Sequence, residues 1–129
     1  MRLLIDTHVL IWTVRNEPRI PERVKSIVKA TGNAVVVSAV TPWEIAMKVG
    51  QGKLEFDAAF LADFDNRLMA LAFTPLAITS AHGVAAGRLT GRNKDPFDRM
   101  LAAQALSEGL TLVTADAHFG EFQVPTIWS

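Results

Sequence analysis

The amino-acid sequence predicts an α/β fold in which helices cover both faces of a parallel β-sheet. Apolar runs rich in β-branched residues alternate along the chain with segments whose apolar residues follow helical spacing. The first run, residues 2–5, shows no alternation of apolar and polar residues, which is typical of a parallel strand buried on both faces. The chain has 129 residues, close to the usual size of one domain, so we expect residues 1–129 to form a single domain.

The first half of the chain carries clear helix and strand signals after this strand. We expect a helix at residues 7–14, a helix at 21–30, a strand at 34–38 and a helix at 41–49. Asp6 has a side chain preferred at the N-cap, here of the first helix. Thr41 and Glu44 have the spacing of a capping box, and Pro42 fits the first helical position, so Thr41 is the expected N-cap of the third helix.

The second half continues the alternation of helices and strands. We expect a helix at residues 57–71, a strand at 72–76, a helix at 79–86, a helix at 96–108, a strand at 110–114 and a short strand at 126–128. Pro75 restricts the strand at 72–76 to an edge of the sheet. Thr79 or Ser80 is expected to cap the helix at 79–86, and Gly109 to end the helix at 96–108. The predicted buried face of that last helix consists of Phe97, Leu101, Ala105 and Leu106.

Composition excludes several classes of protein. Thirteen basic residues balance thirteen acidic ones, so no global field attracts the chain to nucleic acid, and any such contact must be local. No cysteine is present, which excludes disulfides and thiolate zinc sites. No apolar run approaches the length that spans a bilayer, and residues 1–12 lack the features of a signal peptide. We therefore expect a cytoplasmic protein with no membrane contact.

Four acidic residues follow predicted strands or begin predicted helices: Asp6, Glu44, Asp98 and Asp116. Strand ends and helix starts of an open parallel sheet share one edge, so these carboxylates are expected to converge there. Clustered carboxylates repel one another unless a cation neutralises them, and Mg²⁺ or Mn²⁺ is the natural occupant of an oxygen-rich site. Such a site activates water for hydrolysis of a phosphodiester, and one ion or two ions fit the pattern equally.

Each acid also has a purely structural interpretation. Asp6 and Asp116 suit helix N-caps, and the charge of Asp98 suits the N-terminal end of a helix dipole. Glu44 fits the capping box with Thr41 and can form an ion pair with Lys48 four residues later.

Taken together, four segments resemble the PIN domain, and specifically VapC-type toxins of toxin–antitoxin pairs. The motif order, the spacing and the total length agree over essentially the whole chain. The segments are Leu3-Leu4-Ile5-Asp6-Thr7-His8, Thr41-Pro42-Trp43-Glu44, Asp95-Pro96-Phe97-Asp98-Arg99 with the helical residues that follow, and Leu112-Val113-Thr114-Ala115-Asp116.

The resemblance implies a three-layer sandwich with a parallel sheet in the order 3-2-1-4-5 flanked by helices. It also implies an endoribonuclease toxin dependent on Mg²⁺ or Mn²⁺, which cuts a cellular RNA with a metal-activated water and is neutralised by a VapB-like antitoxin. A homodimer is the implied assembly. By motif, Asp6, Glu44 and Asp98 are the core metal-binding and catalytic acids, Asp116 is the fourth, and Asp95 caps its helix.

Three further residues are candidates for contact with RNA under the same resemblance: Thr114, Arg99 and Lys48. For Lys48 the pair with Glu44 is the favoured role, and Thr114 is equally well explained as a strand-end residue. The chain departs from relatives in carrying Asn93 where a histidine often stands, and its fourth acidic motif is shorter.

The remaining histidines and large aromatic residues receive structural roles. His8 is expected on a helix surface or in the core, His82 within its own helix, and His118 exposed. Trp12, Trp43, Phe60 and Phe64 are expected in the core or at an interface.

Two other functions compete with the nuclease. One is a receiver-like signalling domain, which also carries an acidic Mg²⁺ pocket; against it, Asp6 stands alone after its strand and no lysine follows Asp116. The other is a non-enzymatic interaction module whose acids are only helix caps. Stable acyl-phosphate formation on incubation with a small phosphodonor would fit only the receiver. Calorimetric binding of Mn²⁺ that Asp6→Asn abolishes would not fit acids that are only helix caps.

Overall fold

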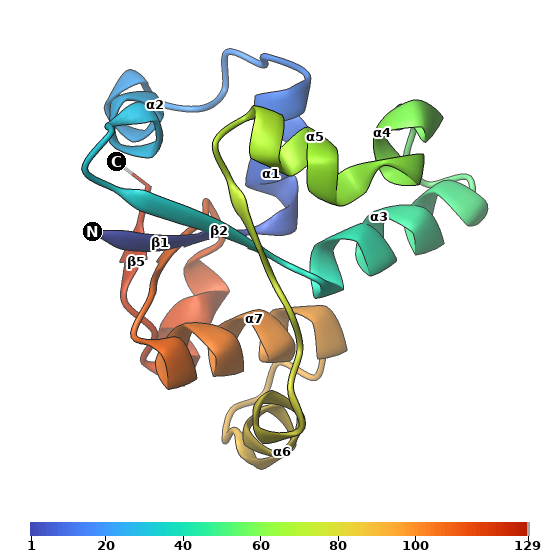
Figure 1. Ribbon diagram of the computed structural model, residues 1–129. Coiled ribbons are helices and arrows are strands. Elements are labelled where there is room, and N and C mark those ends of the chain that lie inside the picture. The colour runs from blue at the N-terminus through green and yellow to red at the C-terminus, as the bar shows by residue number, and fades with distance from the viewer. Residues whose placement is uncertain (129) are drawn as a thin grey trace.

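The computed structural model describes residues 1–128, and within them five strands form one sheet (Figure 1). The strands are β1 (Arg2–Ile5), β2 (Ala34–Ser38), β3 (Thr74–Leu76), β4 (Thr111–Val113) and β5 (Thr126–Ile127). Their order is β3-β2-β1-β4-β5, and every neighbouring pair is parallel. Leu4 of β1 lies opposite Val36 of β2 and Leu112 of β4. The predicted α/β class and the sheet order implied by the resemblance are both confirmed.

The helices lie in two layers, one on each face of the sheet (Figure 1). Alternate residues of a strand point to opposite faces. Leu3 and Ile5 pack in one apolar core with α1, α2, α3, α4 and α5, whereas Leu4 packs in a second core with α7 and the 3-10 helix η1. The bounds are α1 (Thr7–Val14), α2 (Glu22–Lys29), α3 (Val40–Gly50), α4 (Ala58–Ala62), α5 (Phe64–Ala70), α6 (Ser80–Arg88), α7 (Pro96–Glu108) and η1 (Ala117–Phe122).

The capping box predicted at the start of α3 is wrong. Helix α3 begins at Val40, and its first amide is bound by the hydroxyl of Ser38 at 3.0 Å. Thr41 therefore lies inside the helix, where its buried hydroxyl pairs with that of Thr7 on α1 at 3.1 Å. Pro42 still fits the first turn, because the amides there have no partner within the helix. Glu44 consequently projects from the body of α3 and does not cap its end.

The predicted helix at residues 57–71 is in fact two helices. Asp63 adopts φ −134° and ψ 42°, outside the helical region, and separates α4 from α5. The buried face predicted for α7 is correct for three residues and wrong for Leu106, which is 45% exposed. The 3-10 helix η1 was not predicted.

Most other boundaries agree with the sequence predictions. Asp6 caps α1, Thr79 caps α6, Asp95 caps α7, and Gly109 ends α7 in the left-handed conformation. His82 completes the cap of α6, since its backbone N–H donates to Thr79 Oγ1 and its Nδ1 accepts from the Thr79 amide. Over residues 1–128, every helix is too short or too polar to cross a bilayer.

A candidate acidic site at the carboxyl edge of the sheet

The structure places the four predicted acids near the carboxyl ends of the central strands. Asp6 follows β1 directly, Asp116 follows β4 at the start of η1, Asp98 lies in the first turn of α7, and Glu44 lies on α3 after β2. The parallel arrangement thus brings segments from distant parts of the chain to one edge of the sheet.

A buried hydroxyl connects the first and fourth acids. Thr114 Oγ1 donates to Asp6 Oδ2 at 2.5 Å and accepts from the backbone amide of Asp116 at 3.0 Å. Asp6 Oδ1 accepts from the amide of His8 at 2.7 Å, and Asp116 Oδ1 accepts from the amide of His118 at 2.8 Å. Both carboxylates are therefore fixed by helix-cap hydrogen bonds, and Thr114 sets their relative position.

Glu44 is buried on α3 and is bound to a cation of the same helix. Its side chain is 6% exposed, and Oε2 lies 2.6 Å from the ammonium nitrogen of Lys48. The predicted ion pair between these residues is confirmed. The contact between the hydroxyls of Thr7 and Thr41 joins α1 to α3. It therefore holds α3, which carries Glu44, against α1, which begins at Asp6.

The imidazole of His8 responds to both acids. The pKa of His8 is raised above its ordinary value, chiefly by the neighbouring carboxylate of Asp6 and also by the negative charge of Glu44, while burial and Lys48 lower it. The ring is 56% exposed, with Nδ1 3.7 Å from Asp6 Oδ1. Of the two positions predicted for His8, helix surface or core, the structure shows the surface, and the predicted exposure of His118 is confirmed, since its side chain is 81% exposed.

Asp98 is the acid of the site whose pKa is clearly shifted. Burial raises its pKa to about 6, a hydrogen bond from Asn93 lowers it, and the negative charges of Asp95, Asp6 and Asp116 raise it. The Asn93 amide nitrogen lies 2.9 Å from Asp98 Oδ2. Asp98, Asp6 and Asp116 are therefore within electrostatic range of one another.

This raised pKa makes the stability of the fold depend on pH in a defined direction. The folded state binds the Asp98 proton more tightly than the unfolded chain, whose carboxyl keeps the ordinary value of 3.8. The stabilising contribution is fully present below pH 3.8 and is lost as the pH rises through about 6. Asparagine does not ionise, so Asp98→Asn escapes this loss. In metal-free buffer, the free energy of unfolding of Asp98→Asn, measured with urea, should therefore rise relative to that of the parent as the pH increases from 3.8 to about 6. A difference independent of pH would contradict the prediction.

Arg99, a candidate for RNA contact, is bound within the protein. Its guanidinium donates to the backbone carbonyls of Ala86, Leu89 and Asn93, and it lies 5.7 Å from the ring centroid of Phe122. These contacts fix the segment between α6 and α7. Contact between Arg99 and RNA stays a prediction.

The acids fit a hard divalent cation in donor type and charge. Their oxygens are the ligands that Mg²⁺ prefers, and the mutual repulsion that raises the pKa of Asp98 is relieved by a positive ion. Within residues 1–128 no three acidic, histidine or cysteine side chains form a group that could hold an ion as it stands. Magnesium needs only one or two carboxylates, because it keeps several of its waters. Glu44, already paired with Lys48, is the least available of the four.

Sequence reasoning missed two contacts that build the site. Nothing in the sequence signals the hydroxyl pair of Thr7 and Thr41, which depends on the packing of α1 against α3. The contact between Asn93 and Asp98 was also missed, although Asn93 had been noted as a departure from the family pattern.

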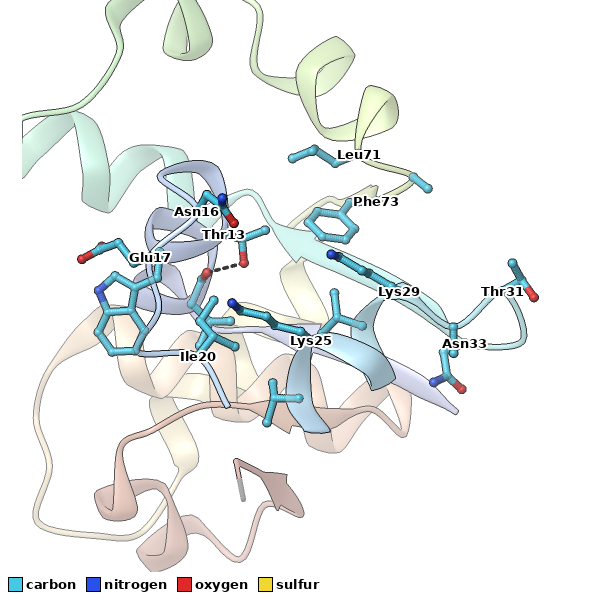
Figure 2. A pocket seen from close by; sticks show the side chains of 16 residues that line it. Thr13, Asn16, Glu17, Ile20, Lys25, Lys29, Thr31, Asn33, Leu71 and Phe73 are labelled. Carbon is cyan, nitrogen blue, oxygen red and sulfur yellow. Dashed lines mark hydrogen bonds between the residues drawn. The ribbon is translucent and has the colours of Figure 1, made fainter. Parts of the chain in front are cut away.

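A hollow lies away from the acids, between α1, α2 and the turn after α5 (Figure 2). This α1–α2 hollow has a volume of about 480 Å³. Figure 2 shows Lys25 and Lys29 extending across it between Ile20 and Phe73. None of the four acids lines it. The lining residues include Val9, Trp12, Ile20, Val24, Val28, Leu71 and Phe73.

The fold and the acidic edge define a class of α/β proteins that bind ligands at the carboxyl ends of parallel strands. Residues 3–124 match the PIN domain model, and the chain belongs to the PIN domain family. It is 28% identical over 116 residues to the tRNA(fMet)-specific endonuclease VapC of Shigella flexneri, covering 88% of this chain and 86% of that protein. Among curated proteins, the VapC of Salmonella typhimurium is similar at 27% identity over the same shares of the two chains.

Solved structures share the fold. The VapBC2 complex of Rickettsia felis, bound to a DNA fragment from its promoter, contains a chain with a TM-score of 0.73 and 17% identity, and the match covers 100% of both chains. VapBC-1 of nontypeable Haemophilus influenzae contains one with a TM-score of 0.70 and 21% identity, covering 98% of this chain and 97% of that one. At these identities the likeness concerns the fold.

Proposed function

We propose that this chain is a VapC-type endoribonuclease toxin that hydrolyses a cellular RNA with the help of Mg²⁺ or Mn²⁺. The observation that carries the proposal is the link through Thr114 between Asp6 and Asp116, together with the effect of both negative charges on the pKa of Asp98. Capping explains Asp6 and Asp116, and the helix dipole suits Asp98, but neither role requires the three acids to lie at one edge of the sheet. The endonuclease relative supports the same function.

In this proposal the chain's own residues bind and orient the reacting groups. When bound there, a divalent cation would supply positive charge to the phosphoryl group and lower the pKa of the attacking water. Asp6 and Asp98 hold the cation, Asp116 completes the negative edge, and Thr114 fixes the distance between Asp6 and Asp116. Lys48 holds the buried carboxylate of Glu44 in place through their ion pair, Glu44 is the remaining candidate ligand, and Lys48 is a candidate for contact with the substrate.

The direct test is cleavage of purified initiator tRNA and of total cellular RNA with Mg²⁺ or Mn²⁺ present. We expect discrete fragments with either ion and none after addition of excess chelator, with activity restored when the ion is added back. Cleavage undiminished by chelator would contradict metal dependence. No cleavage of any RNA, together with no Mn²⁺ binding in calorimetry, would contradict the nuclease itself.

We further propose that a VapB-like antitoxin neutralises the chain and that an apolar segment of it occupies the α1–α2 hollow. The hollow has an apolar floor bordered by polar residues, among them Glu17, and the two lysines that cross it would meet a carboxylate of the bound segment (Figure 2). A concave apolar site with a few polar groups is the usual form of a binding site. The homodimer implied by the resemblance stays a prediction, supported by the indole of Trp43, which is 57% exposed.

Two exposed apolar residues of the same segment provide a matched test of this docking site. Leu71 is 40% exposed and lines the hollow, whereas Met69 is 57% exposed and does not line it. Leu71→Lys should weaken binding of the cognate VapB-like antitoxin by about 10-fold or more, since burying a leucine contributes about 1.5–3 kcal/mol. Met69→Lys should bind like the parent in the same calorimetric titration. Equal affinity of both variants would place the antitoxin elsewhere.

A further inference from the structure

Asn93, in the segment between α6 and α7, makes four hydrogen bonds, one of them to Asp98. Asn93 accepts from the amide of Asp95 through Oδ1 at 2.9 Å and donates to Asp98 Oδ2 through Nδ2 at 2.9 Å. Its own backbone amide donates to Glu121 Oε1 at 2.6 Å, and its carbonyl accepts from Arg99 at 2.9 Å. Both ends of the side chain and both polar backbone groups are therefore fixed.

Asp98 depends on this residue more than the neighbouring acids do. Asp6 and Asp116 each accept a hydrogen bond from a backbone amide two residues later. Asp98 instead lies inside the first turn of α7, where the amides of Phe97 and Asp98 are already bound by Asp95 Oδ1. Among the described residues, the carboxylate of Asp98 receives its hydrogen bond from Asn93.

The backbone around Asn93 is held against η1 by close packing. Gly91 has φ +140°, and a Cβ atom there would lie 2.9 Å from Glu121 Oε1 and 2.9 Å from Phe122 Cε1. Side chains rarely adopt this φ, and no room exists for one. The close approach lets Glu121 reach the Asn93 amide. The segment that begins at Asp116 thus supports the segment that orients Asp98.

The geometry points to Asn93 as a positioning residue that, anchored by Glu121, holds the carboxylate of Asp98 in the orientation that binds the divalent cation. This inference rests on the proposed metal-dependent function and adds to it a residue that orients a ligand. The Asn93 amide binds Oδ2 of Asp98 and so restricts rotation of the carboxylate. Partners of this kind commonly contribute 10–100-fold to metal affinity or activity.

The most selective variant is Asn93→Ser. Its hydroxyl can still accept from the Asp95 amide, so the turn before α7 is kept, but it carries no amide to reach Asp98. The matched control is Asn66→Ala, which removes an asparagine-to-aspartate contact, 2.7 Å from Asn66 Nδ2 to Asp63 Oδ1, on the exposed side of α5. Glu121→Ala provides a second test, because it frees the Asn93 amide without changing Asn93 or Asp98.

The measurement is calorimetric titration of each purified protein with Mn²⁺ alone, beside its thermal melt. We expect Asn93→Ser and Glu121→Ala to bind Mn²⁺ about 10-fold more weakly or worse, and Asn66→Ala to bind like the parent. The effect of Asn93→Ser should vanish when Asp98 is already asparagine, since the two residues then no longer act through one carboxylate.

The outcomes separate this inference from the proposed function. If the parent binds Mn²⁺ and cuts RNA and Asn93→Ser binds the ion equally well, the positioning role is wrong and the nuclease stands. An equal loss in the Asp98→Asn background would also overturn it, because the loss would then not pass through Asp98. If the parent neither binds Mn²⁺ nor cuts RNA, the proposed function fails and the inference fails with it.

Discussion

Asp6→Asn is expected to lower RNA cleavage by at least about 100-fold while leaving the fold intact, because even the partners of metal ligands contribute 10–100-fold. Asparagine is as good an N-cap as aspartate, so its side-chain oxygen can still accept from the amide of His8. Its amide can donate to Thr114 Oγ1, which reverses that hydrogen bond without breaking it. Only the negative charge and the ligand oxygen are lost.

A second N-cap provides the matched control for this variant. Asp57 caps α4 by accepting from the amide of Ala59 at 2.9 Å, in the same geometry as Asp6, but it belongs to an exposed helix away from the acidic edge. Asp57→Asn should cleave RNA at the parental rate. If Asp6→Asn also cleaves at that rate, with both variants folded by circular dichroism, the acids are caps and the interaction module becomes the better description.

Thr114→Val is expected to lower the free energy of unfolding by about 1–3 kcal/mol, the usual cost of leaving a buried polar group without its partner. The valine has nearly the shape of threonine, but it leaves Asp6 Oδ2 without its donor and the Asp116 amide without its acceptor. Since both partners belong to the proposed site, RNA cleavage should fall as well. Urea unfolding measures the first effect.

Thr114→Ser is the control that separates the hydroxyl from the methyl group. Serine keeps the donor to Asp6 and the acceptor for Asp116, so it should lose only the packing of one methyl group and retain most of the cleavage. If Thr114→Val and Thr114→Ser unfold at the same urea concentration and cleave equally well, the hydroxyl does not connect the two acids.

The elements that local patterns specify were predictable. Strand β1 and helix α7 each carry their own signal: the apolar residues Leu3, Leu4 and Ile5 in the strand, and Asp95 and Gly109 at the two ends of the helix. Asp6 was predictable as a cap for the same reason, and Lys48 as the partner of Glu44 because four residues on a helix bring side chains together. In each case, the residues that carry the signal lie within one short segment of the sequence.

The errors concern features that tertiary packing decides. The side chain of Thr41 is able to cap a helix, but in the fold it lies buried against Thr7, and Ser38 binds the first amide in its place. The apolar spacing of residues 57–71 continues across Asp63, although the backbone leaves the helical region there. The link from Thr114 to Asp6 joins residues 108 apart, so no local pattern contains it.

The central position of β1 in the sheet has a consequence for when the chain becomes dangerous to the cell that makes it. On the ribosome, Asp6 and Glu44 emerge before β4, but β1 pairs on one side with β4, and Asp6 meets Thr114, 108 residues later in the sequence, only after the residues between them have been synthesised. Contacts between such distant segments form late and cooperatively. Under the proposed function, a nascent or prematurely terminated chain that lacks residues 98–116 is harmless. This delay leaves time for an antitoxin to be present before the first complete toxin folds.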